Sequence, residues 1–189
     1  MNTLELEHRF EEIYGKRAEH TYFAPGRVNL IGEHTDYNGG LVFPCALSFG
    51  TYLLIAKRED RQNRFSSVNM DRSYTANANA FEDKPTAWIK YPIGVMKEFA
   101  ERGSDVWGYD LLYYGNIPNG AGLSSSASIE VVTAVMLNDV TKVHLDMTEL
   151  VKISQKAETI TSGSTVELWI SLLSAWAKPI TRSLWIVPA

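Results

Sequence analysis

The chain has 189 residues, 45% of them hydrophobic, with a formal net charge of −4 and a pI near 5.6. This length can bury one good core, or one domain with part of a second, and the acidic balance argues against nucleic acid or an anionic membrane as the main partner. Cys45 is the single cysteine, which excludes an intrachain disulfide and a thiolate metal cluster. The charged N-terminus and the lack of an apolar run near 18 residues predict no signal peptide, no membrane span and a cytoplasmic location.

The first part of the chain predicts a helix followed by a sheet. Residues 2–14 show helical periodicity, with Asn2 as the N-cap, Glu5 three residues later and Gly15 as the stop signal. Short β-rich runs separated by Gly, Pro and Asn fill residues 21–57, which predicts an antiparallel or mixed sheet. The next thirty residues are polar and irregular, with a strand candidate near Phe65.

The second part of the chain predicts helices around one more strand. A helix is expected over residues 88–102 and a strand over residues 108–115. A further helix is expected to end near Thr141. The last helix should run from Met147 to about Glu158, and Asp146 and Glu149 should form the capping pair at its N-terminus.

The stretch PGRVNLIGEHTDYNGG, residues 25–40, is the first candidate site. A strand over residues 28–31 would lead into a loop with four consecutive polar side chains: Glu33, His34, Thr35 and Asp36. Ionised carboxylates accept hydrogen bonds and histidine can both donate and accept, so this set suits a polyhydroxylated small molecule. A solvated acidic loop is the alternative interpretation.

The stretch NIPNGAGLSSSASIE, residues 116–130, is the second candidate site. A strand, a Gly-rich loop and a helix in this order point backbone N–H groups and the positive end of a helix dipole at a phosphate. Ser124, Ser125 and Ser126 add hydroxyls for phosphate oxygens or Mg²⁺. The loop has no lysine, which excludes a Walker A motif, and its spacing does not fit the dinucleotide fingerprint. An ordinary serine N-cap after a turn is the alternative.

The two stretches, in this order and about 80 residues apart, resemble the first and second motifs of galactokinases in the GHMP family of small-molecule kinases. The resemblance covers residues 1 to about 158 and implies an α+β fold, the GHMP kinase N-terminal domain, with a mixed sheet, helices on one side and the C-terminal ferredoxin-like domain absent. It implies phosphoryl transfer from ATP to the anomeric hydroxyl of galactose, with Mg²⁺. Galactose and ATP are then the partners, with no nucleic acid and no membrane, and the oligomeric state stays open.

The resemblance also assigns site residues. Glu33, His34, Thr35 and Asp36 would hold the sugar hydroxyls, and Arg27 would stabilise charge on the reacting phosphate. Ser126 and Glu158 would hold Mg²⁺. The ATP loop would consist of Gly120, Ala121, Gly122, Leu123, Ser124, Ser125 and Ser126.

Residues 159–189 depart from the family pattern. Members continue with a segment resembling N-x-x-V-G-V-N-C-G-I-M-D-Q-F, whereas this tail holds three of the five Trp and a single acidic residue, Glu167. Synonymous codons chosen from Glu158 onward and read in a shifted frame give NNYVGVNCGIMDQFA, so we interpret the tail as out-of-frame translation. The aspartate of the family segment would then fall where this chain has Ile170.

The loss of that aspartate and of the second domain predicts no useful galactokinase activity for this polypeptide, because a positioned acid or base typically contributes about 10²- to 10⁴-fold. A non-catalytic galactose and ATP sensor is one alternative, another GHMP sugar kinase is a second, and an α+β fragment without a ligand is a third. The sequence leaves open whether galactose or a close analogue is preferred.

Overall fold

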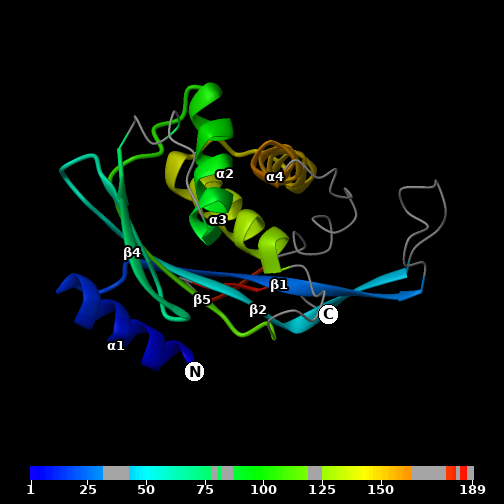
Figure 1. Cartoon of the computed structure of the whole chain (residues 1–189), viewed down its shortest axis with the longest axis horizontal. Helices are drawn as coiled ribbons and strands as arrows, with labels where there is room; N and C mark the ends of the chain where they lie inside the picture. Colours follow the sequence, from blue (N-terminus) through cyan, green and yellow to red (C-terminus); the bar gives the residue numbers. More distant parts are fainter. Residues whose placement is uncertain are drawn as a thin grey trace.

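A mixed sheet organises the part of the chain that the computed structural model describes, which is residues 1–31, 43–77, 81, 87–118, 125–162, 178–181 and 184–186 (Figure 1). Its strand order is β1-β2-β5-β3-β4. β3 and β5 pair in parallel and the other neighbours pair antiparallel, which confirms the predicted mixed sheet. The strands are β1 (His20–Ile31), β2 (Phe43–Lys57), β3 (Asn63–Ser67), β4 (Met70–Ala76) and β5 (Tyr109–Gly115).

β1 and β2 are longer than the short runs that the sequence predicts. They pair from His20 opposite Ile55 to Ile31 opposite Phe43, with irregular register between Pro25 and Arg27. β1 continues through Pro25 and Gly26, because it lies at the edge of the sheet, where a missing backbone N–H and a bulge are tolerated.

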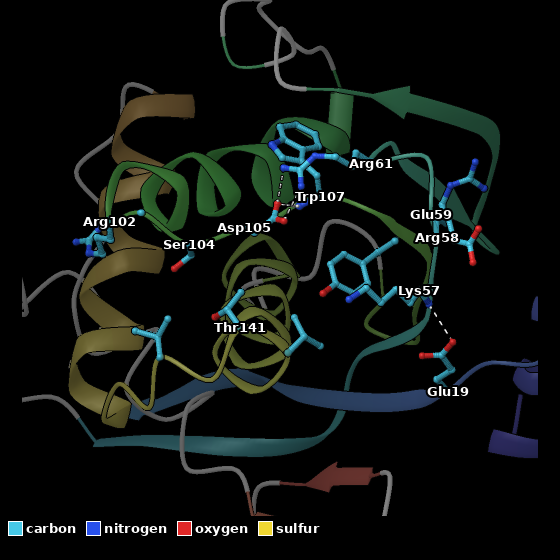
Figure 2. A pocket seen from close by; sticks show the side chains of 14 residues that line it. Glu19, Lys57, Arg58, Glu59, Arg61, Arg102, Ser104, Asp105, Trp107 and Thr141 are labelled. Carbon is cyan, nitrogen blue, oxygen red and sulfur yellow. Dashed lines mark hydrogen bonds and ion pairs between the residues drawn. The ribbon is translucent and has the colours of Figure 1, made fainter.

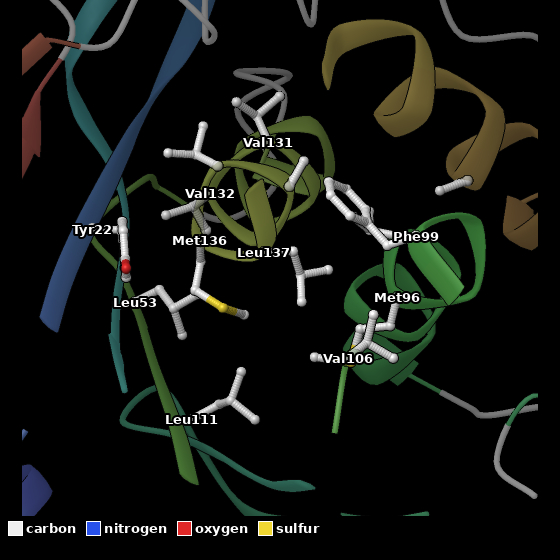
Figure 3. Close-up of a cluster of buried hydrophobic side chains, with 14 of the residues drawn as sticks. Tyr22, Leu53, Met96, Phe99, Val106, Leu111, Val131, Val132, Met136 and Leu137 are labelled. Atoms are coloured by element: carbon white, nitrogen blue, oxygen red, sulfur yellow. The ribbon is translucent and has the colours of Figure 1, made fainter. Parts of the chain in front are cut away.

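Three helices cover one face of the sheet, and α1 lies against the other (Figure 1). The three are α2 (Lys90–Glu101), which follows a 3₁₀ turn η3 (Ala87–Ile89), α3 (Ser125–Thr141) and α4 (Met147–Ser162). Leu53 and Leu111 pack in the core under these helices (Figure 3), whereas Leu54 and Leu112, one residue further along each strand, pack with α1. Side chains alternate between the faces of a strand, so both faces of these strands are buried.

α1 (Thr3–Tyr14) forms as predicted and has complete caps. The side chain of Asn2 accepts from the backbone N–H of Glu5, and the Glu5 carboxylate accepts from the N–H of Asn2, both at 2.9 Å. Gly15 ends the helix with a φ of 69°, a left-handed conformation that glycine adopts without strain. The expected helices on one side are α2, α3 and α4, and α1 differs from them because its buried Leu6 and Phe10 cover the second face.

The predicted strand near Phe65 is β3, and its partner β4 was not predicted. In the tail, β6 (Lys178–Thr181) and β7 (Leu184–Ile186) pair antiparallel, and β7 lies near β1. The apolar tail segment at residues 168–176 falls outside the described residues. No helix among the described residues is long and apolar enough to span a membrane.

Candidate functional site

The structure describes only part of the two predicted motifs. Glu33, His34, Thr35 and Asp36 lie outside the described residues, and so do residues 120–124. Arg27, Ser125, Ser126 and Glu158 are described, together with the chain on both sides of the second motif. The geometry of the site is therefore built from these residues.

Ser126 and Glu158 meet where the first turn of α3 approaches the last turns of α4. The Ser126 hydroxyl donates a hydrogen bond of 2.7 Å to Oε1 of Glu158, whose residue is only 6% exposed. The helix–helix packing of α3 on α4 brings together two side chains that are 32 residues apart. The sequence named both residues, and the structure places them in direct contact.

A second buried acid, Glu130, stands one turn further along α3. It is completely buried, and burial together with the neighbouring Glu158 carboxylate raises its pKa to about 10. Neither carboxyl oxygen of Glu130 accepts a hydrogen bond from an N–H or O–H group of a described residue. Glu130 is therefore protonated at neutral pH, because burial and the nearby Glu158 carboxylate both disfavour its charged form.

This arrangement fits a hard divalent cation. The Ser126 hydroxyl and the Glu158 carboxylate supply only oxygen atoms, which Mg²⁺ prefers, and Mg²⁺ usually takes one or two carboxylates with water and substrate phosphates as the remaining ligands. Within the described part of the chain no cluster of three or more His, Cys, Asp or Glu could hold a metal by itself. A cation here would thus depend on ligands from a bound substrate.

A pocket of about 390 Å³ opens beside Ser126, between the start of α2, the end of β5 and the start of α3. Trp88 and Tyr113 meet edge to face with ring centroids 5.2 Å apart, and the ammonium of Lys90 lies 5.0 Å from the centre of the Tyr91 ring. Aromatic faces suit a flat heterocycle, and a lysine suits a negative group beside it. The remaining wall residues are Thr51, Ser67, Asn69, Met70, Gly115, Ile117, Ser125 and Ile129.

This pocket is not predicted by the sequence pattern. In the helix predicted over residues 88–102, Ile89 and Ile93 share one apolar side, and Trp88 and Tyr91 lie off that side. Two aromatic residues off the buried stripe of a helix were the available signal. Asn69 gives no such signal, because it reaches the pocket through the β3–β4 turn.

Arg27 lies on β1 opposite Ala46, and the residue is only 5% exposed. It does not line the pocket beside Ser126. Arg27 thus lies on the strand that holds the start of the first motif, and Ser126 lies on the helix that begins within the second.

A larger cavity of about 990 Å³ lies at the opposite end of α3, beside Thr141 (Figure 2). It contains several arginines, but each is held by an acid: Arg61 binds Asp105 through two hydrogen bonds of 2.9 and 3.0 Å. Arg58 and Arg102 likewise pair with acidic groups. None of the described residues that the sequence predicts for the site lines this cavity.

Two family models match the chain. One describes a galactokinase galactose-binding signature and matches residues 8–57, and the other describes the GHMP kinases N-terminal domain and matches residues 90–167. The first match contains Arg27 and the first motif, and the second contains the pocket residues of α2 as well as Ser126 and Glu158.

Curated relatives and solved structures agree with these models. The galactokinase of Fusobacterium nucleatum is 53% identical over 154 residues, which cover 79% of this chain and 40% of that protein. The galactokinase of Clostridium tetani is 49% identical over 160 residues, 84% of this chain and 41% of that protein. The chain therefore spans about 40% of the length of the curated relatives it matches.

Among solved structures, Lactococcus lactis galactokinase complexed with galactose superposes with a TM-score of 0.84 at 35% identity, covering 90% of this chain and 46% of that one. A mevalonate kinase superposes with a TM-score of 0.75 at 18% identity over 89% of this chain and 56% of that one, a likeness of fold alone. The matched part of the chain is similar to the N-terminal portion of galactokinases.

Proposed function

We propose that this chain carries the sugar- and nucleotide-binding half of an ATP-dependent galactose kinase site. The contact between Glu158 and Ser126, which also lines the aromatic-walled pocket, is the observation that carries the proposal. A purine ring fits the walls formed by Trp88 and Tyr113, and its phosphates would then extend toward the N-terminus of α3. The similarity to galactokinases supports galactose as the sugar.

The proposed roles follow from chemistry and position. Glu33, His34, Thr35 and Asp36 bind the sugar hydroxyls, and residues 120–126 bind the ATP phosphates. Arg27 stabilises negative charge on the transferred phosphoryl group. Ser126 and Glu158 hold Mg²⁺, which would neutralise charge on the β- and γ-phosphates. Positioning and charge stabilisation supply most of such a step, so the chain's own contribution is to bind and align the two substrates.

Turnover by the chain itself is a separate matter from binding. Because the matched relatives are more than twice as long, a site built from this portion alone leaves the substrates more open to water, which weakens each electrostatic contact. We therefore propose that the chain binds galactose and ATP and turns them over far more slowly than a full-length galactokinase. A non-catalytic sensor would also bind both ligands, so binding alone does not distinguish the two functions. A cytoplasmic location remains part of the proposal.

Tryptophan fluorescence tests nucleotide binding at the proposed place. Trp88 lines the pocket beside Ser126, and Trp107 lines the larger cavity at the other end of α3, so the two form a matched pair. ATP with Mg²⁺ should change the fluorescence of the Trp107→Phe variant as it does that of the unmodified chain, and the Trp88→Phe variant should lose the response. A response lost only with Trp107→Phe would reject this pocket as the nucleotide site.

Calorimetric titration with galactose, and a coupled assay with ATP, Mg²⁺ and galactose, complete the test. Binding of both ligands with little turnover is the expected result. Turnover near that of a full-length galactokinase would contradict the prediction on activity, and binding of neither ligand would contradict the proposed function.

A further inference from the structure

A largely buried polar cluster connects the two motifs at their described residues. We call it the strand junction: Ala24 on β1, Gly50 and Thr51 on β2, Asn116 after β5, and Ser128 on α3. Ala24 and Thr51 are paired in the sheet, and Thr51 is also paired with Gly115, so the junction crosses three adjacent strands. Asn116 precedes residues 119–124 and Ser128 follows them, so both flanks of that segment meet the sheet here.

Ser128 connects α3 to both β1 and β2. Its hydroxyl donates to the backbone carbonyl of Ala24 at 2.7 Å and shares a second hydrogen bond with the Thr51 hydroxyl at 2.9 Å. A serine hydroxyl has one proton and a carbonyl can only accept, so the Thr51 hydroxyl donates the second bond. Ser128 is completely buried and Thr51 is 2% exposed, so water does not compete for either bond.

Asn116 connects the other flank to the same place. Its side-chain oxygen accepts from the backbone N–H of Gly50 at 2.7 Å, and its backbone N–H donates to the Gly50 carbonyl at 3.1 Å. Glycine is required at position 50, because a Cβ there would lie 2.2 Å from the Ala24 carbonyl oxygen. The backbones of β1 and β2 therefore lie unusually close together at the point where Asn116 and Ser128 bind them.

We infer that Ser128 is a positioning residue that keeps the start of α3 in fixed register with β1, and so keeps the phosphate-binding residues in place relative to Arg27. The inference rests on the proposed function, in which Arg27 acts on a phosphate held at the start of α3. Ser128 lies two residues after Ser126, and Ala24 lies three residues before Arg27. Misplacement by about 1 Å can cost a reaction on the order of 10²-fold, so a buried link of this kind has a direct use.

Hydrogen exchange on the ligand-free chain tests the link. Ser128→Ala removes both bonds, and Ser154→Ala is the matched control: Ser154 is also a completely buried helical serine, but its hydroxyl bonds the Leu150 carbonyl within its own helix at 3.0 Å. We expect Ser128→Ala to raise exchange about 3- to 10-fold in peptides covering residues 20–27 and 112–118, relative to Ser154→Ala. Exchange in α1 should stay unchanged.

Thr51→Val provides a second variant of nearly unchanged shape. It removes the hydroxyl bond to Ser128 but leaves the bond from Ser128 to Ala24, so a smaller increase in the same peptides is expected. This variant decides the question if Ser128→Ala does not fold. Increases that are equal for Ser128→Ala and Ser154→Ala, or spread evenly over the chain, would overturn the inference.

Ligand titrations separate this inference from the proposed function. If the unmodified chain binds galactose and an ATP analogue, Ser128→Ala should lower the affinity for both ligands by about 3- to 10-fold. Ser154→Ala should lower it by less than about twofold. Unchanged affinities for Ser128→Ala would overturn the positioning role even if exchange rises. If the unmodified chain binds neither ligand, the proposed function fails, and the exchange pattern alone decides whether Ser128 fixes the register of α3 on β1.

Discussion

The hydroxyl of Ser126 lies 2.7 Å from Oε1 of Glu158, so the N-terminus of α3 and the end of α4 share one polar contact. We predict that Glu158→Gln lowers the contribution of Mg²⁺ to nucleotide affinity by about 10- to 100-fold, because a neutral amide binds a hard cation less strongly than a carboxylate. The measurement is ATP-analogue affinity with Mg²⁺ and with EDTA. Glu149→Gln is the control on the same helix, since Glu149 is exposed and pairs with Lys152. Equal Mg²⁺ dependence in both variants would argue against a metal-binding role for Glu158.

Glu130 predicts a specific dependence of stability on pH. Burial and Glu158 raise its pKa from 4.5 to about 10 in the folded chain, so the folded state holds this proton more tightly than the unfolded state. The stabilisation is fully present below about pH 4.5 and is lost as pH rises toward 10. The Glu130→Gln variant has no carboxyl to titrate, so it does not lose this stability. The difference in free energy of unfolding between the variant and the unmodified chain should therefore shift in favour of the variant by about 1–3 kcal/mol from roughly pH 6 to pH 9. Denaturant unfolding without Mg²⁺ measures it, and parallel pH curves would contradict the prediction.

Protonation of Asp110 at acid pH should lower the stability of the fold, and Asp110 lies outside the candidate site. Its buried carboxylate lies 2.6 Å from Nε of Arg64, 2.9 Å from Nη1 of Arg58 and 2.9 Å from Nζ of Lys16. Burial alone would raise the pKa of Asp110, but the hydrogen bonds from Arg64, Lys16 and Arg58 outweigh it and hold the pKa below its ordinary value. The stabilisation is therefore present above the unfolded pKa, near 3.9, and is lost as pH falls further.

Asp110→Asn should lower the free energy of unfolding at neutral pH by about 3–5 kcal/mol, because three cations lose their shared acid. Asp105→Asn is the control: this exposed partner of Arg61 should cost less than about 1 kcal/mol. Thermal or urea unfolding distinguishes the two. A loss of similar size for both variants would show that the Asp110 cluster contributes no more than a surface pair.

The tail predicts a feature of the coding DNA. If residues 159–189 arise from a shifted frame, the DNA around codon 158 contains an alternative frame that encodes the family segment N-x-x-V-G-V-N-C-G-I-M-D-Q-F. Sequencing this region decides the point, and DNA without such a frame would reject the interpretation. A corrected chain should then show the turnover that we expect to be weak or absent here.

Local features of the fold could be predicted because they depend on neighbours in the chain. The capping box of Asn2 and Glu5, the stop at Gly15 and the predicted end of α3 at Thr141 are all confirmed. The Asp146 side chain caps α4 by accepting from the N–H of Glu149 at 2.9 Å, as expected. Each of these signals acts within one turn, so no knowledge of the tertiary structure is needed.

Other features depend on partners far along the chain and could not be predicted. β4 reads as polar and irregular, and it forms because β3 offers it an edge to pair with. The placement of α1 against the second sheet face needs Leu54 and Leu112 to point away from the other helices. Glu130 reads as an ordinary residue after a serine cluster, and only the packing of α3 on α4 brings it to Glu158.

The sequence by itself determined the resemblance to galactokinases, because PGRVNLIGEHTDYNGG and PNGAGLSSSASIE place chemically specific side chains and glycines at short, fixed spacings. It also determined most helices, through periodicity and caps. The tertiary structure alone decided the aromatic pocket beside Ser126, the buried acid pair and the strand junction at Ser128. These depend on hydrogen bonds and contacts between elements up to 104 residues apart, which only the packing of the helices on the sheet can bring together.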